Sequence, residues 1–431
     1  MSTFLLSVTV ALLPLLVPRG PGNTAPADLF AAAFLVLALL ALIQRGRRLE
    51  VPAAPALALI LVGSLIALTR SQDPKSALLT VVVDVYLLVL LVAIVNHLDR
   101  DPQALRTVLV VWTAAALVWA TVLIGAHYHV LPRALSELLQ VKEGAKRAAG
   151  PARNNPNLAA SYLVTSLFVL LASPWPRRFL GSALAAGWLL LGVFATGSLG
   201  GLLGLAVGGA LLVAGAYLRG ARTTAQVRAL LGAALLAGAL AMTGLLLVAG
   251  VPRFGLSDVA TVSEQAKGGA LGGSVGRADK SLTGRLGLWT QAVARTGPQV
   301  LTGIGPGQAK SELQISNGSV TRKGTLDVHS LHNDYLAFLV ERGILGLAGL
   351  LWLYAALARR AGRLAPAGWR WGVWLPALGA GFVATAADAF FHEAFHYRHV
   401  VVLFALLFAA GDLARAERRY TAEELELHAV G

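Results

Sequence analysis

The stretch ALLTVVVDVYLLVLLVAIV, residues 77–95, carries a single acidic or basic side chain, Asp84. Its apolar residues follow one another without the alternation of a half-buried strand, as from Leu87 to Val92. About 20 apolar residues span the hydrocarbon core of a bilayer. Only helices and closed barrels satisfy their backbone hydrogen bonds there. The stretch therefore predicts a transmembrane helix.

The whole chain has the same character. Of its 431 residues, 56% are hydrophobic and 13% are charged, whereas soluble domains carry about a quarter charged residues. This composition excludes a water-soluble fold, a disordered chain and a collagen-like fibre. The sequence has no cysteine, so disulfide, iron–sulfur and thiolate chemistry are also excluded.

We predict an all-α polytopic membrane protein with about twelve transmembrane helices. The expected spans are 4–17, 28–43, 53–69, 77–95, 107–126, 158–173, 179–195, 199–218, 229–250, 331–357, 371–391 and 397–411. The chain then divides into helices 1–9 within residues 1–250, a large outer loop at 251–330, helices 10–12 within 331–411 and a tail at 412–431.

The distribution of Lys and Arg gives the orientation. With the N-terminus in the cytoplasm, the short inner loops hold arginine clusters such as 45–48 and 359–370. The short outer loops hold Arg19, Arg70 and Lys75. Because cytoplasmic loops carry the excess of basic residues, both termini are expected in the cytoplasm.

Two longer outer loops, 127–157 and 251–330, are also basic. Long loops translocate regardless of charge, so they do not contradict the topology. Their charge is either ordinary solvated surface or a complement to an anionic, phosphorylated partner. Within them, residues 132–147 predict an interfacial or connecting helix, and the apolar pattern from 284 to 296 predicts a second helix.

Several residues are candidates for chemistry. His332 precedes a span and is either a general base or a helix-entry histidine. Arg285 either binds phosphate through two parallel hydrogen bonds from its planar guanidinium or is a solvated surface charge. Asp388 and Asp84 are acids within predicted spans, where ionisable groups are functional hypotheses by default. The glycines in 303–307 either let a phosphate approach the backbone or form a turn.

His392, Glu393 and His396 fit the pattern H-E-x-x-H, which is typical of a zinc protease. On a helix this spacing puts both imidazoles on one face. A third ligand and an open coordination position are also needed. The sequence offers no convincing third ligand nearby, so a polar helix end at the outer interface is preferred and no metal is expected.

Four stretches taken in order resemble the O-antigen ligase/polymerase superfamily, a group of bacterial inner-membrane enzymes that join glycans. They are Asn-Pro-Asn at 155–157, Thr-Gly-Ser-Leu-Gly-Gly at 196–201, Gly-Arg-Leu-Gly-Leu-Trp at 284–289 with Gly-Ile-Gly-Pro-Gly at 303–307, and His-Asn at 332–333 with Glu-Arg-Gly-Ile-Leu-Gly at 341–346. One departure is Leu199, which stands where the family usually has an arginine. Either another arginine such as Arg153 takes that role, or the phosphate is held with fewer charges.

The resemblance implies a multi-pass protein of the bacterial inner membrane with its active site in the periplasm. It implies transfer of a glycan from undecaprenyl pyrophosphate to a sugar hydroxyl of lipid A core, in lipopolysaccharide biosynthesis, without a cofactor. His332 would be the general base, and Arg285, helped by Arg153, would stabilise the pyrophosphate. The expected partners are the lipid-linked donor, the lipid A core acceptor and membrane lipids, with no nucleic acid.

The side chains and amides expected to bind substrate are those of Arg153, Asn155, Asn157, Asn333, Gly305, Gly307 and Asp388. The closest alternative is a polymerase, in which the acceptor is another lipid-linked glycan. A lipid or glycan transporter and the zinc protease are further alternatives. A transporter predicts internal repeats and intramembrane charged pairs, and few of these features are evident in the sequence.

Overall fold

The computed structural model describes residues 1–16, 24–44, 46, 48–141, 147–150, 155–218, 285–314, 316–320, 326–328, 330–367 and 369–430. The predicted span 229–250 and Arg153 lie outside these residues.

The described residues are mainly helical. The helices are α1 (Ser2–Ala11), α2 (Pro26–Gln44), α3 (Ala54–Leu68), α4 (Pro74–Leu98), α5 (Pro102–His127), α6 (Arg133–Leu138), α7 (Pro156–Ala172), α8 (Phe179–Thr196), α9 (Leu199–Leu218), a helix at 285–296, η3 (Gly297–Leu301), α13 (Ala309–Leu313), α14 (Asp334–Leu364), η4 (Ala365–Ala367), α15 (Leu375–Asp388) and α16 (Arg398–Val430). Two short antiparallel hairpins pair β1 (Ser316–Val320) with β2 (Leu326–Val328), and β3 (Trp369–Arg370) with β4 (Val373–Trp374).

The helices fit an all-α membrane protein. Within the described residues, six helices are long and apolar enough to cross a bilayer, namely α2, α4, α5, α8, α14 and the first part of α16. The helices α1, α3, α7, α9 and α15 include shorter apolar stretches. Each predicted span except 229–250 coincides with one of these helices. The total of twelve spans stays a prediction.

Some boundaries differ from the sequence-based expectation. The helix expected over 132–147 is the short α6 in the described residues, since the chain turns at Gln140, whose φ is 51°. The span expected from 331 begins at Asp334, because Asn333 caps it by accepting a hydrogen bond from Leu336 N at 2.9 Å. The helix expected at 284–296 is confirmed at 285–296.

Helix starts follow a local rule in which a capping side chain precedes a proline. The Asp73 carboxylate accepts a hydrogen bond from Ser76 N at 3.1 Å, and Pro74 is the first residue of α4. Asp101 caps α5 in the same way, with Pro102 first. An Asp N-cap satisfies an otherwise free helix amide, and proline lacks an amide at the position where none is needed.

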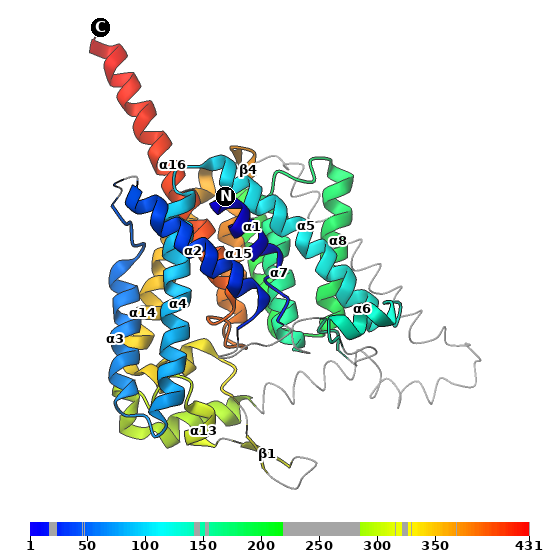
Figure 1. Ribbon diagram of the computed structural model, residues 1–431, viewed down its shortest axis with the longest axis vertical. Helices are drawn as coiled ribbons and strands as arrows, with labels where there is room; N and C mark the ends of the chain where they lie inside the picture. Colours follow the sequence, from blue (N-terminus) through cyan, green and yellow to red (C-terminus); the bar gives the residue numbers. More distant parts are fainter. Residues whose placement is uncertain are drawn as a thin grey trace, which may run out of the picture.

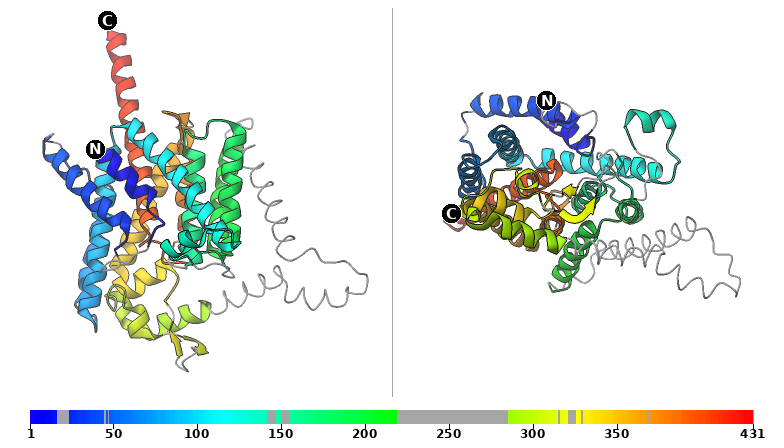
Figure 2. Two further views of the ribbon diagram at one scale, coloured as in Figure 1. Left: turned by 45° about the vertical axis from the view of Figure 1, so that its right-hand side comes forward. Right: turned by 90° about the horizontal axis from the view of Figure 1, so that it is seen from below.

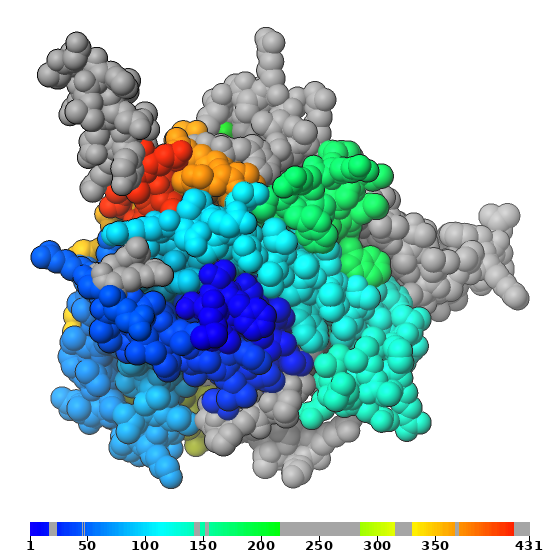
Figure 3. Space-filling view, turned by 45° about the horizontal axis from the view of Figure 1, so that its top comes forward, coloured from blue at the N-terminus to red at the C-terminus, as the bar shows by residue number. Residues whose placement is uncertain are grey.

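The bundle is layered around α16. Helices α3, α4 and α14 lie side by side at one edge, α7 and α15 lie near the centre, and α5 and α8 form the other edge (Figure 1). Residues 400–410 of α16 are all buried. Helices α1 and α2 lie on the outside, as the space-filling view shows (Figure 3). Segment 285–314 lies across one end of the bundle (Figures 1 and 2).

Both chain ends point toward the other end of the bundle, away from segment 285–314 (Figure 1). That the termini share one side of the membrane stays a prediction. The assignment of that side to the cytoplasm stays a prediction.

Small residues allow α3 and α14 to approach closely. A Cβ atom at Gly63 would lie 2.6 Å from Gly346 N, and one at Gly349 would lie 2.7 Å from Ile60 N. Small residues at interfaces are a common basis of helix association in membranes, where lipid offers no hydrophobic driving force.

Helix α14 is broken at Gly343, whose φ of 69° lies in the left-handed region that glycine tolerates. The backbone of the preceding loop fills the break. Ile304 N donates to Val340 O at 3.0 Å, and Gly305 N donates to Glu341 O at 3.1 Å. The break therefore fixes segment 303–307 against the end of the bundle.

We expect Gly63→Ala to destabilise the protein by about 1–3 kcal/mol, because the new methyl group meets backbone rather than a movable side chain. Thermal unfolding in detergent would measure the loss. Gly209→Ala is the matched control, since a Cβ at Gly209 meets nothing within 4 Å. Equal melting temperatures for the two variants would contradict the close approach.

Candidate functional site

The start of α14 is tied to the segment between α15 and α16 by Asp334. This buried carboxylate accepts hydrogen bonds through Oδ2 from Ala394 N at 3.0 Å and from Phe395 N at 2.8 Å. The Asp334 amide in turn donates to Ala389 O at 2.9 Å. The segment 389–397, which is not helical, is therefore held next to His332 and Asn333.

His332 lies directly before this junction. Its backbone amide donates to Glu393 Oε1 at 3.0 Å, and its ring lies 3.3 Å from Ser330 Oγ. The φ of His332 is 51°. Burial raises the pKa of the Glu393 carboxyl, and the nearby Glu341 raises it further.

Arg285, on the helix at 285–296, also contacts segment 389–397. Its guanidinium carbon lies 5.4 Å from the centre of the Phe391 ring. Burial lowers the pKa of this guanidinium, and the charge of Asp388 opposes the shift. Asp388 Oδ1 lies 2.6 Å from His392 Nδ1. Asp388 therefore holds His392 and interacts electrostatically with Arg285.

A further hydrogen bond links the helix that bears Arg285 to the residue before His332. Trp289 Nε1 donates to Leu331 O at 2.9 Å. The two residues predicted to be catalytic thus both contact segment 389–393, although they come from separate parts of the chain.

The glycine-containing segment 303–307 is hydrogen-bonded to Glu341. Its carboxylate accepts hydrogen bonds from Gly307 N at 2.8 Å and from Ala309 N at 3.2 Å. The Gly305 amide is also bonded within the protein, to the Glu341 carbonyl. This geometry fits the interpretation that the glycines of 303–307 form a turn. A contact between substrate and Gly305 or Gly307 stays a prediction.

Asn155 and Asn157 act near the start of α7. Asn155 Oδ1 caps the helix by accepting from Asn157 N at 3.0 Å and Leu158 N at 3.2 Å. Asn157 Oδ1 accepts from Arg147 Nη2 at 2.7 Å, and Arg147 Nε donates to Thr196 O at 2.8 Å. Their contact with substrate stays a prediction, as does that of Asn333, whose side chain caps α14.

Arg147 was not singled out from the sequence, yet it lies on the turn that leads to Leu199. Its Nε atom lies 3.7 Å from the position that a Cβ at Gly197 would take. A Cβ at Gly200 would lie 2.7 Å from Asp388 Oδ1, so this glycine lets α9 approach α15. A cation thus contacts the turn at 196–197, just before Leu199, and the only hint in the sequence was the basic character of the loop that bears Arg147.

The sequence also missed an ion pair between α4 and α14. Arg342 Nη2 lies 2.8 Å from Asp84 Oδ2, and both side chains are fully buried. His396 Nε2 lies 2.7 Å from Asp84 Oδ1. Asp84 was noticed as an isolated acid in a span, but no local pattern identifies a partner so far along the chain.

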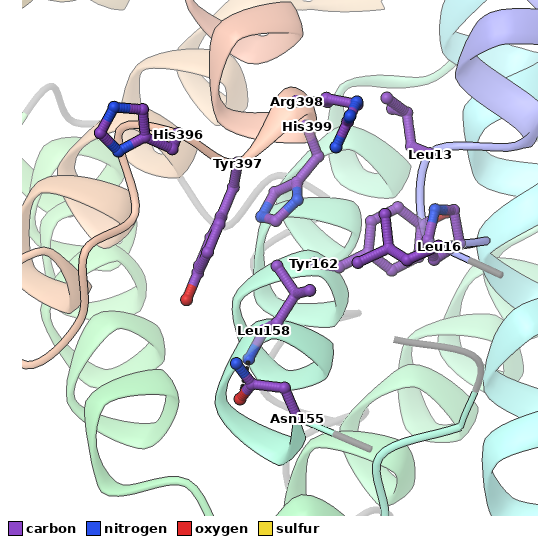
Figure 4. Close-up of a pocket in the computed structure, with 10 residues that line it drawn as sticks. Leu13, Leu16, Asn155, Leu158, Tyr162, His396, Tyr397, Arg398 and His399 are labelled. Atoms are coloured by element: carbon purple, nitrogen blue, oxygen red, sulfur yellow. Dashed lines mark hydrogen bonds between the residues drawn. The ribbon is translucent and has the colours of Figure 1, made fainter. Parts of the chain in front are cut away.

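Two cavities flank the chain at His396 and Arg398. The larger, of about 1130 Å³, lies between α2, α4 and the junction around Glu393. The smaller, of about 340 Å³, is lined by Asn155, which caps α7, and by Tyr162 of α7, together with Leu13 and Leu16 (Figure 4). In the smaller cavity His399 Nε2 lies 3.1 Å from Ser161 Oγ. Segment 396–399 therefore separates the two cavities.

Residues 184–351 match the family model described as O-antigen ligase. The matched segment runs from α8 into α14 and includes Arg285, Gly305, Gly307, His332 and Asn333. It confirms the predicted resemblance to the O-antigen ligase/polymerase superfamily. No curated protein matches the chain.

The O-antigen ligase match ends before the H-E-x-x-H motif. The zinc-protease hypothesis assumed that this motif lies on a helix, and in the structure it does not. The motif lies between the end of α15 at Asp388 and the start of α16 at Arg398. His392 faces Asp388, whereas His396 faces Asp84. Among the described residues no group of three or more His, Cys, Asp or Glu side chains is placed to hold a metal ion.

We expect Asp84→Asn to lower stability by about 1.5–3 kcal/mol, because it removes a charge-assisted hydrogen bond from the buried Arg342 guanidinium and leaves it Glu341, whose Oε2 lies 3.3 Å from Nη1. Heating in detergent followed by size-exclusion chromatography would measure the loss. Asp73→Asn on the same helix is the control, because Asn and Asp cap a helix about equally well. A variant at Asp84 as heat-resistant as this control would show that the ion pair is dispensable.

Proposed function

We propose that this protein transfers O-antigen polysaccharide from undecaprenyl pyrophosphate to a sugar hydroxyl of lipid A core at the periplasmic face of the bacterial inner membrane. The observation that carries the proposal is the meeting of Arg285 and His332 at one segment. Arg285 stacks over Phe391, and the His332 amide binds Glu393. The family match over both residues supports a ligase or polymerase role in O-antigen processing.

The two residues have complementary roles in such a transfer. The acceptor hydroxyl oxygen forms a bond to the anomeric carbon while the bond from that carbon to the pyrophosphate oxygen breaks. The hydroxyl proton passes to the His332 imidazole, a side chain that commonly serves as a general base. The bonding electron pair leaves with the pyrophosphate, whose growing negative charge is stabilised by the Arg285 guanidinium.

The surroundings of Arg285 suit an anionic leaving group. The guanidinium is partly removed from water, so its attraction to a pyrophosphate is screened less than at an open surface. Arg147 supplies a second cation near the turn at 196–199. The pyrophosphate leaving group provides the driving force, so the transfer needs no nucleotide.

Reconstitution tests the proposal directly. Purified protein would be combined with undecaprenyl-pyrophosphate-linked glycan and lipid A core, with a chelator present and no nucleotide. The expected product is a lipid A band shifted on a gel. A ladder of longer lipid-linked glycan with lipid A unchanged would make the protein a polymerase. Unchanged substrates would contradict both activities.

Replacing His332 should remove the proposed general base. We expect His332→Asn to lower the transfer rate by about 10²–10⁴-fold, the range for general acid–base catalysis. Asn is chosen because it tolerates the positive φ of this position better than most residues. Initial rates would be compared with those of His129→Asn, at a second histidine with a positive φ, 58°. Normal transfer by His332→Asn would remove the general-base role.

Replacing Arg285 should show whether its planar fork matters. We expect Arg285→Lys to lower the rate by about 10²–10³-fold, nearly as much as Arg285→Ala, because a point charge cannot bind phosphate through two parallel hydrogen bonds. Arg295→Lys on the same helix is the control, since Arg295 bonds to the backbone carbonyls of Leu313 and Gln314. Full activity of Arg285→Lys would contradict two-point phosphate binding.

A further inference from the structure

Asp388 and His392 form a buried pair with two unused polar atoms. Their side chains are 3% and 2% exposed, and Asp388 Oδ1 lies 2.6 Å from His392 Nδ1. Among the residues that the structure describes, Asp388 Oδ2 and His392 Nε2 have no hydrogen-bond partner. Most buried polar side-chain atoms have one, so each exception needs a physical explanation. Two exceptions in one pair point to a role beyond holding the fold.

The hydrogen bond between these residues fixes which nitrogen of His392 can change its proton. An ionised carboxylate only accepts hydrogen bonds, so Nδ1 carries the hydrogen that Asp388 Oδ1 accepts. Nε2 then has either a lone pair or a second proton, and the ring is either neutral or positively charged. Gly200 lets the first turn of α9 lie against the ring, because a Cβ atom there would lie only 2.8 Å from Nδ1.

Asp388 also acts on Arg285, the residue proposed to stabilise the pyrophosphate. Its charge opposes the effect of burial, which lowers the pKa of the Arg285 guanidinium. Helix α9 carries no acidic or basic residue over Leu199–Leu218. The other ionisable groups that interact with Asp388, or with the same tyrosines, are Tyr335, Tyr354, Tyr397, Asp334 and Glu393. Arg285 is thus the cation of this cluster unless His392 is protonated.

The charge of His392 therefore decides how well the cluster accepts an anion. Asp388 Oδ2 accepts no hydrogen bond from the described residues, so much of the carboxylate charge acts on Arg285. With a neutral imidazole, the charges of Asp388 and Arg285 cancel. With a protonated imidazole, Asp388 is balanced by His392, and the charge of Arg285 is left for a bound anion.

We propose that His392 takes up one proton from water when the lipid-linked pyrophosphate binds at Arg285, and releases it when the product leaves. The proton binds the lone pair of Nε2, the nitrogen without a partner among the described residues. His392 is a positioning residue, because it acts on the substrate through Asp388 and Arg285. This inference rests on the proposed function for the identity of the anion.

Calorimetry measures this proton uptake without turnover. Full-length protein in nanodiscs would be titrated with undecaprenyl-pyrophosphate-linked glycan, without acceptor, in two buffers of equal pH and different ionisation enthalpy. The difference in binding heat gives the number of protons taken up. The donor itself contributes none, because its pyrophosphate is a diester with no ionisation near neutral pH.

His392→Asn is the test variant, because the side-chain NH2 of Asn can donate to Asp388 but does not titrate. His392→Gln takes its place if thermal unfolding shows that the first variant does not fold. The matched control is His97→Gln, in the last turn of α4. It replaces a histidine whose Nε2 lies 3.0 Å from Thr3 Oγ1, and Gln keeps a nitrogen at that position.

Wild-type protein and His97→Gln should take up protons between about pH 5 and pH 8, where histidine titrates, whereas the His392 variant should take up none. Donor binding without proton uptake by the wild-type protein would overturn the inference and leave the proposed function intact. Uptake retained by the His392 variant would assign the proton to another group, such as Glu393, and would also overturn it. Failure of the wild-type protein to bind the donor would overturn the proposed function as well.

The pH dependence of donor affinity gives a second readout. Because the bound state holds more protons than the free state, the wild-type Kd for the donor should rise by about tenfold as the pH increases across this range. The Kd of the His392 variant should be high throughout, and the KM for lipid A core should be the same in both proteins. A wild-type Kd that stays constant or falls with rising pH would contradict proton uptake.

Discussion

The ion pair between Asp84 and Arg342 joins distant parts of the chain inside the apolar bundle. Both side chains are fully buried, so each charge needs an opposite charge beside it, and Glu341 and His396 extend the pair into a network. Asp84 holds the middle of α4 against the break in α14, and its second oxygen orients His396. The position of the loop after α15 therefore depends on a charge in α4.

The break in α14 lies next to this ion pair and positions the loop that precedes α14. A continuous helix would use the backbone carbonyls of Val340 and Glu341 internally. With the break at Gly343, those carbonyls bind the loop at 303–307, and the Glu341 carboxylate binds the amides beyond it. The helix that bears Arg285 precedes this loop. The left-handed conformation of one glycine thus helps to place a candidate catalytic arginine.

The candidate site was predicted in part. The motif order identified Arg285 and His332, and the tertiary structure brings both to segment 389–393. Asp388 was noticed because an acid in an apolar span stands out in a sequence. Its actual partner, His392, had been considered only for a zinc motif on a helix. That reading assumed helical spacing, which the segment does not have.

The sequence by itself determined that this is an all-α membrane protein. Its apolar runs are long enough to span a bilayer and do not alternate, and in lipid such a run satisfies its backbone hydrogen bonds by forming a helix. It also determined many helix starts, because capping residues and prolines act locally. Only the tertiary structure decided the partner of Asp84, the cation at the turn just before Leu199 and the cavity between α2 and α4. These features arise where segments far apart in the chain pack together, and no local pattern encodes which segments will meet.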